Sequence, residues 1–272
     1  MASGGNPGHS RAPHFSAMET LTVIKAGTGV LTRASDGTLD GASLVRLVTA
    51  IAGLVESGHR CLLVSSGAVG AGVSAFGLGG YPSDLTTKQA CAAVGQARLM
   101  HTYGSLFQNF NLAVAQVLLT AADLQTPERR QYVSNTLQRL LAEPNIVPII
   151  NENDSVAVEE LRVGDNDMLS SQVAALLGAK TLVLLTSVDG LLSPETNELV
   201  EEVPDVNAVL GFAKDERGRF SIGGMASKLQ AVKNSVDAGI TVHIAHGRKP
   251  ERLAAILAGE KGVSTRFAAN GQ

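Results

Sequence analysis

Two lysines stand beside glycine-rich segments that lie far apart in the sequence. Lys25 ends an apolar run and is followed by Ala-Gly-Thr-Gly, whereas Lys228 closes the segment Ile222-Gly-Gly-Met-Ala-Ser. Glycine lets backbone N–H groups come close to an anion, and a neighbouring ammonium completes a phosphate cradle. Each segment alone also fits an ordinary glycine turn or loop with a lysine beside it. A nucleotide phosphate is therefore the first ligand to consider for the pair.

Three further segments carry groups that could bind a small charged molecule. Residues 65–72 read Ser-Ser-Gly-Ala-Val-Gly-Ala-Gly, which would bring a helix N-terminus close to a carboxylate or phosphate, or simply pack two helices closely. Residues 151–155, Asn-Glu-Asn-Asp-Ser, offer amides and carboxylates to the polar groups of an amino acid, or cap a turn. Residues 164–167, Gly-Asp-Asn-Asp, place two acids at a helix start, where capping explains only one. These acids could orient phosphate-binding lysines or contact Mg²⁺.

The histidines do not suggest hydrolytic chemistry. None of the six has the spacing of a nucleophile's base or of a metal ligand set. Phosphoryl transfer to a carboxylate requires no general base, because that acceptor is already ionised at neutral pH. Such a reaction does require cations and backbone donors to gather negative charge, and the segments above supply both.

The composition excludes several classes of protein. The chain has 272 residues, of which 44% are hydrophobic and 17% charged, with a formal charge of -3 and scattered basic residues. This balance gives no electrostatic footprint for nucleic acid, and no apolar run approaches the length of a membrane span. Cys61 and Cys91 lie in apolar or helical stretches, which favours reduced core thiols and a cytoplasmic protein.

Short apolar runs alternate with longer amphipathic stretches, which predicts an α/β fold with a mainly parallel sheet covered on both faces. The strands are expected at Leu21–Ile24, Cys61–Ser65, Leu112–Val117, Ile146–Ile150, Thr181–Leu185 and Ile240–Ala245. The helices are expected at Gly41–Ser57, Asp84–Asn109, Glu128–Ala142, Asn166–Leu177, Ala226–Ala238 and Pro250–Leu257. The polar segments that follow strands should then meet at one edge of the sheet.

Nothing marks a second domain within the patterned part of the chain. We expect a disordered tail over residues 1–18 and one domain over residues 19–272. Residues 156–163 alternate apolar and charged positions, which suggests a β-hairpin at the sheet edge, and residues 205–223 look like a mobile polar segment. Either segment could act as a lid.

Taken in order, these segments resemble the amino acid kinase family. The resemblance rests on residues 25–28, 65–72, Gly95-Gln96, 151–154, 164–167, 186–190 and 223–228. Within the family they resemble the branch that phosphorylates the side-chain carboxylate of L-glutamate with ATP. The resemblance implies a three-layer α/β/α sandwich and the formation of glutamyl 5-phosphate in the first step of proline biosynthesis.

The resemblance also implies a role for individual residues. Lys25 and Lys228 would flank the transferring phosphoryl group, and Asp167 would hold both lysines in position. Glutamate would contact Ser66, Gly67, Asn151, Asp154 and Asn166. ATP would lie against Lys25, Thr186, Ser187, Ile222, Gly223, Gly224, Met225, Ala226, Ser227 and Lys228. Mg²⁺ would be carried mainly on the nucleotide phosphates, near Asp165.

Regulation and assembly are implied in the same way. Family members are commonly inhibited by proline at or near the glutamate site and are typically homo-oligomers, so we expect a dimer or tetramer. This sequence ends soon after Phe267, without the C-terminal RNA-modification-enzyme-like domain of many bacterial members. Gly29, Ser187 and Ser221-Ile222 depart from the family pattern, which predicts an altered affinity for the nucleotide with catalysis retained.

Three alternative functions stay open from the sequence. A sibling kinase acting on acetylglutamate, aspartate, carbamate or UMP would share the fold and the lysines, but the polar cluster at residues 151–154 argues against it. A non-catalytic sensor of glutamate or proline would not need Lys25, Asp167 and Lys228. A hydride-transferring Rossmann enzyme would show a different glycine fingerprint after its first strand.

Overall fold

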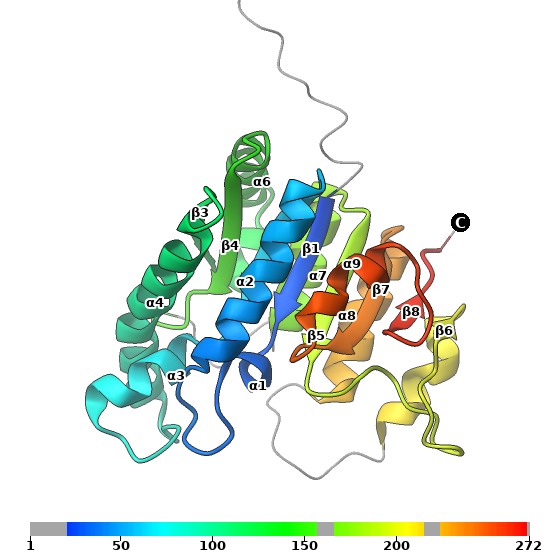
Figure 1. The fold of residues 1–272 in the computed structure, drawn as a ribbon, viewed down its shortest axis with the longest axis horizontal. Helices are drawn as coiled ribbons and strands as arrows, with labels where there is room; N and C mark the ends of the chain where they lie inside the picture. The colour runs from blue at the N-terminus through cyan, green and yellow to red at the C-terminus, as the bar shows by residue number, and fades with distance from the viewer. Residues whose placement is uncertain (1–20, 157–165, 215–223, 271–272) are drawn as a thin grey trace, which may run out of the picture.

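The computed structural model describes residues 21–156, 166–214 and 224–270. One sheet of eight strands forms its centre, in the order β3-β4-β2-β1-β5-β7-β8-β6. Helices α2, α4 and α9 cover one face of the sheet, and α6, α7 and α8 cover the other (Figure 1). The expected three-layer α/β/α sandwich is confirmed.

The described strands pair in parallel, apart from β7 and β8, which pair antiparallel. They are β1 (Leu21–Ala26), β2 (Arg60–Ser65), β3 (Ala113–Leu119), β4 (Ile146–Glu152), β5 (Thr181–Thr186), β6 (Glu202–Val203), β7 (Thr241–His246) and β8 (Thr265–Phe267). All six residues of β1 are buried, as expected for a central strand covered on both faces.

Helices connect these strands. The α-helices are α1 (Thr28–Leu31), α2 (Gly41–Glu56), α3 (Ala68–Val73), α4 (Leu85–Gln108), α5 (Ala121–Gln125), α6 (Pro127–Leu141), α7 (Asn166–Leu177), α8 (Met225–Asp237) and α9 (Leu253–Leu257). The 3-10 helices are η1 (Ser74–Phe76), η3 (Val206–Lys214) and η4 (Pro250–Arg252). Local sequence sets several starts, since the Asp40 carboxylate accepts from the N–H of Ala42 at α2 and the Asp84 carboxylate from that of Thr87 at α4.

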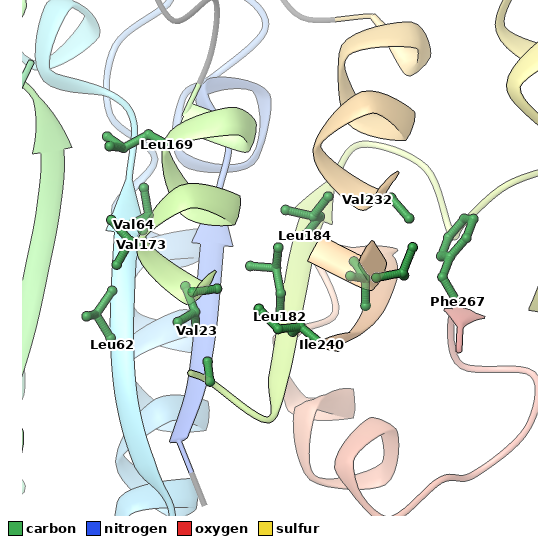
Figure 2. Packing of buried hydrophobic residues seen from close by; sticks show 14 of the residues in the cluster. Val23, Leu62, Val64, Leu169, Val173, Leu182, Leu184, Val232, Ile240 and Phe267 are labelled. Atoms are coloured by element: carbon green, nitrogen blue, oxygen red, sulfur yellow. The ribbon is translucent and has the colours of Figure 1, made fainter. Parts of the chain in front are cut away.

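Most of the hydrophobic core of the described residues lies in two layers separated by the sheet, and a small third cluster lies where α3 meets α4. Neighbouring strand residues point to opposite faces, so Val23 packs with α7 and α8 in one layer while Ile24 packs with α2 and α4 in the other. Figure 2 shows the first of these layers, where Leu169 and Val173 of α7 lie over Val64 of β2. The sheet is therefore held rigidly from both sides.

All six expected strands and all six expected helices are present, with ends that differ by a few residues. The sequence pattern missed β6 and β8, because runs of two and three residues are too short to show periodicity. The tail expected at 1–18 lies outside the described residues. So does the hairpin expected at 156–163, except for its first residue, Val156.

The expected mobile polar segment at 205–223 is wrong in its first half. Residues 206–214 form η3, and Val206 and Val209 are buried in the same core layer as Leu229 and Val232 of α8. The apolar residues at a spacing of three fit the three-residue turn of a 3-10 helix. Residues 215–223 lie outside the described part of the chain.

The strand order brings four of the expected binding segments together. Neighbouring strands β4, β2, β1 and β5 are parallel, so residues that follow them meet at one edge of the sheet. Among the described residues, no helix has the length and apolar character needed to cross a membrane.

Candidate active site

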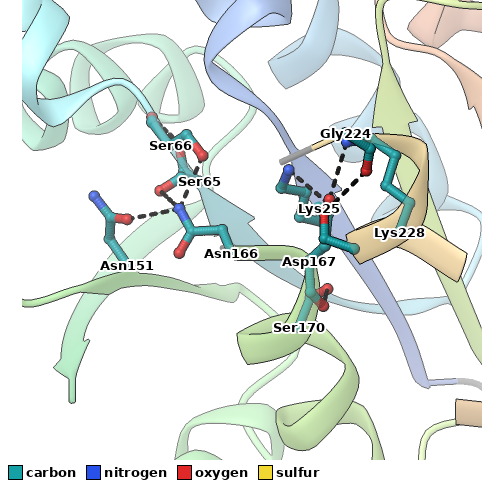
Figure 3. Close-up of polar contacts among 10 residues, drawn as sticks. Lys25, Ser65, Ser66, Asn151, Asn166, Asp167, Ser170, Gly224 and Lys228 are labelled. Carbon is teal, nitrogen blue, oxygen red and sulfur yellow. Dashed lines mark hydrogen bonds and ion pairs between the residues drawn. The ribbon is translucent and has the colours of Figure 1, made fainter. Parts of the chain in front are cut away.

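Two lysines and one aspartate meet at this edge. Lys25 lies near the end of β1, Asp167 in the first turn of α7, and Lys228 in the first turn of α8. The Asp167 carboxylate contacts the Lys25 Nζ at 2.6 Å through one oxygen and the Lys228 Nζ at 3.1 Å through the other. Figure 3 shows the three side chains converging from three different elements.

The charged groups of this cluster are buried. Lys25, Asp167 and Lys228 are 3%, 0% and 9% exposed, and two positive charges face one negative charge. Charged groups are buried only when paired, and the N-terminus of α7 further favours a carboxylate at Asp167. Two ammonium groups held at one point suit an anionic ligand, such as a phosphoryl group that passes between them.

Gly27 leaves room for the Lys25 ammonium. A Cβ atom at this position would lie 3.2 Å from the Lys25 Nζ, closer than most side-chain contacts allow. The Gly27 N–H donates to the Leu185 carbonyl of β5 at 3.4 Å, which ties the turn to the neighbouring strand. The first glycine segment therefore positions its lysine through close backbone packing.

A second group of polar residues lies beside the lysines. The two hydrogens of the Asn166 Nδ2 are shared among three acceptors, the Ser66 Oγ at 2.8 Å, the Asn151 Oδ1 at 3.0 Å and the Ser65 carbonyl at 3.3 Å. Gly67, which precedes α3, has a φ of 101°, a left-handed conformation that favours glycine. We call the four hydrogen-bonded residues the amide pocket: Ser65, Ser66, Asn151 and Asn166.

The amide pocket contains one buried acceptor without a partner. Asn166 is 9% exposed, and its Oδ1 receives no hydrogen bond from the described residues. A buried carbonyl oxygen without a donor costs about 1–3 kcal/mol, so the site is suited to a ligand that donates an N–H here. The ammonium group of an amino acid is such a donor.

The other expected site residues fall into four groups. Thr186 is buried at the end of β5, and its carbonyl accepts from the N–H of Gly247 at 2.7 Å, whereas Ser187 is exposed. Gly224 immediately precedes α8, so its neighbours Met225, Ala226 and Ser227 form the first turn before Lys228. Asp154 is half-buried in the turn after β4. Ile222, Gly223 and Asp165 lie outside the described residues.

Sequence reasoning missed the supporting role of Tyr103. The Tyr103 hydroxyl of α4 is hydrogen-bonded to the Ser65 Oγ at 2.9 Å, and burial raises the pKa of Tyr103, so the hydroxyl stays protonated. Gln96 and Tyr103 are seven residues apart and therefore lie on one face of α4. This spacing was the sequence signal that could have indicated the supporting role of Tyr103.

A cluster at the β5 and β7 ends was also missed. The Asp189 carboxylate lies 2.8 Å from the Lys249 Nζ and 3.5 Å from the Arg252 Nη1. The hydrogen bond from Lys249 holds the pKa of Asp189 below its ordinary value. The separation of sixty residues between Asp189 and Lys249 gave no sequence signal.

A family model for the amino acid kinase family matches residues 20–246. The chain belongs to the amino acid kinase family. Three curated relatives of this amino acid kinase are each named glutamate 5-kinase. The Herpetosiphon aurantiacus protein is 46% identical over 90% of this chain and 67% of its own length. The Rippkaea orientalis protein is 44% identical over 92% of this chain and 69% of its own length. The Symbiobacterium thermophilum protein is 42% identical over 92% of this chain and 96% of its own length.

Solved structures support the same fold. A carbamate kinase from Giardia lamblia bound to citric acid has a TM-score of 0.64 at 17% identity, covering 93% of this chain and 99% of its own. An isopentenyl phosphate kinase from T. acidophilum, in a product complex, has a TM-score of 0.63 at 18% identity. The match covers 91% of this chain and 100% of the kinase chain. At these identities the likeness concerns the architecture of this amino acid kinase only.

Proposed function

We propose that this chain transfers the γ-phosphoryl group of ATP to the side-chain carboxylate of L-glutamate, the glutamate 5-kinase reaction. The observation that carries the proposal is the buried carboxylate of Asp167 between Lys25 and Lys228, next to the amide pocket. The 42–46% identity to proteins named glutamate 5-kinase supports glutamate as the acceptor. The product, glutamyl 5-phosphate, places the enzyme at the first step of proline biosynthesis.

In the proposed reaction, a carboxylate oxygen of glutamate attacks the γ-phosphorus while the bond from that phosphorus to the β,γ-bridging oxygen breaks. ADP leaves with the electron pair, and no proton needs to move, because the attacking carboxylate is ionised. The Lys25 and Lys228 ammonium groups stabilise the charge that spreads over the phosphoryl oxygens. Asp167 keeps both groups aimed at the same point, so that they need not reorganise during the transfer.

The two substrates approach from different sides of the lysines. The amide pocket, with Gly67 and Asp154 nearby, binds the amino acid, and the unpaired Asn166 Oδ1 accepts from its ammonium group. The N-terminus of α8, with residues 222–228, and Thr186 and Ser187 after β5 bind the nucleotide. Bound ATP is therefore directed with its terminal phosphate toward Lys25 and Lys228.

Mg²⁺ belongs to the proposal as an ion carried on the nucleotide phosphates. Both oxygens of Asp167 already face ammonium groups, and the described residues contain no cluster of three or more His, Cys, Asp or Glu that could hold a metal. A nucleotide-borne Mg²⁺, which needs few protein ligands, fits this donor set and would neutralise charge on the phosphates. Asp165 stays the candidate protein contact.

Regulation and assembly complete the proposal. Proline, whose ring nitrogen also donates hydrogen bonds, would compete with glutamate at the amide pocket and inhibit the first step of its own synthesis. A cytoplasmic homo-oligomer, dimer or tetramer, with one kinase domain over residues 19–272, follows from the family resemblance. Light scattering of the purified chain with and without proline measures the assembly.

The function is tested by ATP consumption with Mg²⁺ and a panel of acceptors. Glutamate, N-acetylglutamate, aspartate, carbamate and UMP are compared, and hydroxylamine traps any acyl phosphate as a hydroxamate. We expect hydroxamate with glutamate only, and a loss of about 10³-fold in kcat for Lys25→Ala, since the lysine stabilises the transition state. Turnover with another acceptor, or none with glutamate, would contradict the proposal.

A further inference from the structure

A row of side-chain amides leads from the edge of the sheet into the amide pocket. The Gln96 Nε2 of α4 donates to the Gln116 Oε1 of β3 at 3.0 Å, and the Gln96 Oε1 accepts from the Asn151 Nδ2 at 3.0 Å. The Asn151 Oδ1 in turn accepts from the Asn166 Nδ2, also at 3.0 Å. Four amides from four different elements are thus linked end to end, and we call them the amide row: Gln116, Gln96, Asn151 and Asn166.

Two backbone groups fix the direction of the amide row. The Glu152 N–H donates to the Asn151 Oδ1 at 2.9 Å, so this oxygen cannot exchange places with the Asn151 nitrogen. The Ser65 carbonyl can only accept, so Asn166 must present its nitrogen there. Asn151 therefore directs its nitrogen toward Gln96. The Gln96 oxygen accepts this hydrogen bond, so the Gln96 nitrogen is directed toward Gln116.

The direction of the amide row determines what the pocket offers a ligand. With its nitrogen engaged by Ser65, Ser66 and Asn151, Asn166 has only its oxygen left, and that oxygen is the buried acceptor without a described partner. An amide with the opposite orientation would offer a donor and would repel an ammonium group. The Ser65 carbonyl and the Glu152 N–H select between these two chemistries, and Gln96 holds the Asn151 amide in the position that this selection requires.

Helix packing holds Gln96 in the row. The preceding residue, Gly95, lies so close to α3 that a Cβ atom there would come within 1.8 Å of the Ala68 carbonyl oxygen. This close approach places α4 against β3 and β4, and the pairing of β3 with β4 sets Gln116 opposite Ile149, two residues before Asn151. Gln116 and Asn151 consequently project to the same side of the sheet, within reach of Gln96.

We propose that Gln96, supported by Gln116, is a positioning residue that makes the amino acid site selective for a substrate with a free ammonium group. It acts through the amides of Asn151 and Asn166 and does not itself touch the substrate. The inference rests on the proposed function, because it names how that same site recognises glutamate.

The test compares two substitutions at Gln96. Gln96→Met keeps the length of the side chain but cannot accept from Asn151, whereas Gln96→Glu keeps an acceptor there, and the exposed Gln116 amide can turn to donate to it. We expect Gln96→Met to raise the KM for glutamate by about 10-fold, the value of a hydrogen bond to a charged or buried partner, with kcat and the KM for ATP within about 3-fold. Gln96→Glu should restore most of the glutamate affinity.

A ligand without the ammonium group supplies a readout that a merely structural role would not change. Glutarate lacks the donor, so the wild-type ratio of its inhibition constant to the KM for glutamate measures the selectivity for an ammonium group. We expect this ratio to fall by about 10-fold in Gln96→Met and by less in Gln116→Leu, which removes the outer support from an exposed position. Gln108→Met, at the exposed end of α4, is the matched control and should behave as wild type.

The outcomes separate the inference from the proposed function. Wild-type hydroxamate formation with glutamate tests the function alone. If the wild-type enzyme phosphorylates glutamate and Gln96→Met and Gln116→Leu keep its selectivity ratio, the amide row has no positioning role. Equal losses in Gln96→Met and Gln96→Glu, or an equal rise in both KM values, would likewise overturn it. Because Gln116 is exposed, its variant decides the question even where Gln96→Met does not fold.

Discussion

At the scale of single residues, the ion pairs of Asp167 differ from surface ion pairs because Asp167 is buried. Its carboxylate is 0% exposed between Lys25 and Lys228, whereas the Lys233–Asp237 pair on α8 joins the same residue types at 2.7 Å with both side chains partly in solvent. An exposed pair contributes at most about 1 kcal/mol, but removal of one partner from a buried pair leaves charge without compensation.

We expect Asp167→Asn to lower both stability and activity. The substitution keeps the volume but leaves two buried ammonium groups facing each other, which should cost about 3 kcal/mol in the free energy of unfolding. The kcat should fall about 100-fold or more, because the lysines lose their alignment. Urea denaturation and steady-state kinetics measure the two effects.

The matched control for Asp167→Asn is Lys233→Met. Its loss of stability should stay below about 1 kcal/mol, and its kcat should be unchanged, because the pair that it breaks is exposed and includes none of the three charged site residues. Equal effects of the two substitutions would contradict the role given to Asp167.

A buried histidine makes stability depend on pH. His243 of β7 is 6% exposed and hydrogen-bonded to the Ser264 Oγ, and burial, with a smaller effect of Arg266, lowers its pKa from 6.5 to about 4. Between these values the unfolded chain binds a proton that the folded chain does not. The free energy of unfolding should therefore fall by about 3 kcal/mol as the pH decreases from 6.5 to 4, and the contribution of His243 is fully present above that window.

We expect His243→Gln to flatten this dependence. Urea denaturation at several pH values within the window gives the slope for each variant, and His101→Gln, exposed on α4, is the control that should keep the wild-type slope. The pKa of His246 is also lowered by burial, so some slope should remain in His243→Gln. An unchanged slope would show that His243 does not stay neutral in the folded chain.

At the scale of elements, the crossing of α3 and α4 connects helix packing with substrate binding. Gly72 and Gly95 allow the contact, since a Cβ atom at Gly72 would lie 2.1 Å from the Cys91 carbonyl oxygen and one at Gly95 1.8 Å from that of Ala68. These obstacles are backbone atoms, so the helices must separate to admit even a methyl group. The residues that α3 and α4 contribute to the site, Ser66 just before α3 and Gln96 on α4, depend on this distance.

We expect Gly95→Ala to destabilise the protein by about 2 kcal/mol and to raise the KM for glutamate, because α4 shifts away from Asn151. Gly53→Ala within α2 is the matched control. A Cβ atom there meets nothing within 4 Å, so the better helix propensity of alanine should stabilise the chain by about 0.5–1 kcal/mol. Denaturation midpoints and kinetics of both variants provide the comparison, and a Gly95→Ala enzyme with wild-type KM would contradict the coupling.

At the scale of the whole molecule, packing encloses both thiols, Cys61 in the core layer beneath α2 and α4 and Cys91 in a small separate cluster with Ala68, Val69 and Ala92. Cys61 of β2 and Cys91 of α4 are 3% and 0% exposed, and burial raises the pKa of the Cys61 thiol to about 12 and that of Cys91 above its ordinary value. Neither thiol can react as a thiolate without an opening of the fold around it.

We expect no rapid reaction with Ellman's reagent in the native state and two reacting thiols in concentrated guanidinium chloride. The slow native rate should decrease further with glutamate and a non-hydrolysable ATP analogue, because ligands that bind only the folded chain oppose its opening. Rapid labelling of Cys61 or Cys91 in the native protein would show that its core layer opens more readily than the packing indicates.

The layers of this fold and the elements that carry its chemistry could be predicted from the sequence pattern. Periodicity along the chain is a local property, so the runs around Lys25, Ser65 and Asn151 could be recognised as strand ends without any knowledge of their neighbours. The polar segments after those strands, in their order, also determined the family. The first half of the segment 205–223 was misread because its short apolar spacing does not resemble an α-helix.

Which of these groups meet becomes visible only in the folded chain. The Asn166 side chain bonds the carbonyl of Ser65, a residue 101 positions earlier, and Lys25 shares Asp167 with a lysine from the other end of the chain. The amide row depends on the order of strands β3-β4-β2 and on the close crossing of α3 and α4. Contacts of this kind follow from packing in three dimensions, where the burial of both faces of the sheet selects one arrangement, and they leave no periodic trace in the sequence.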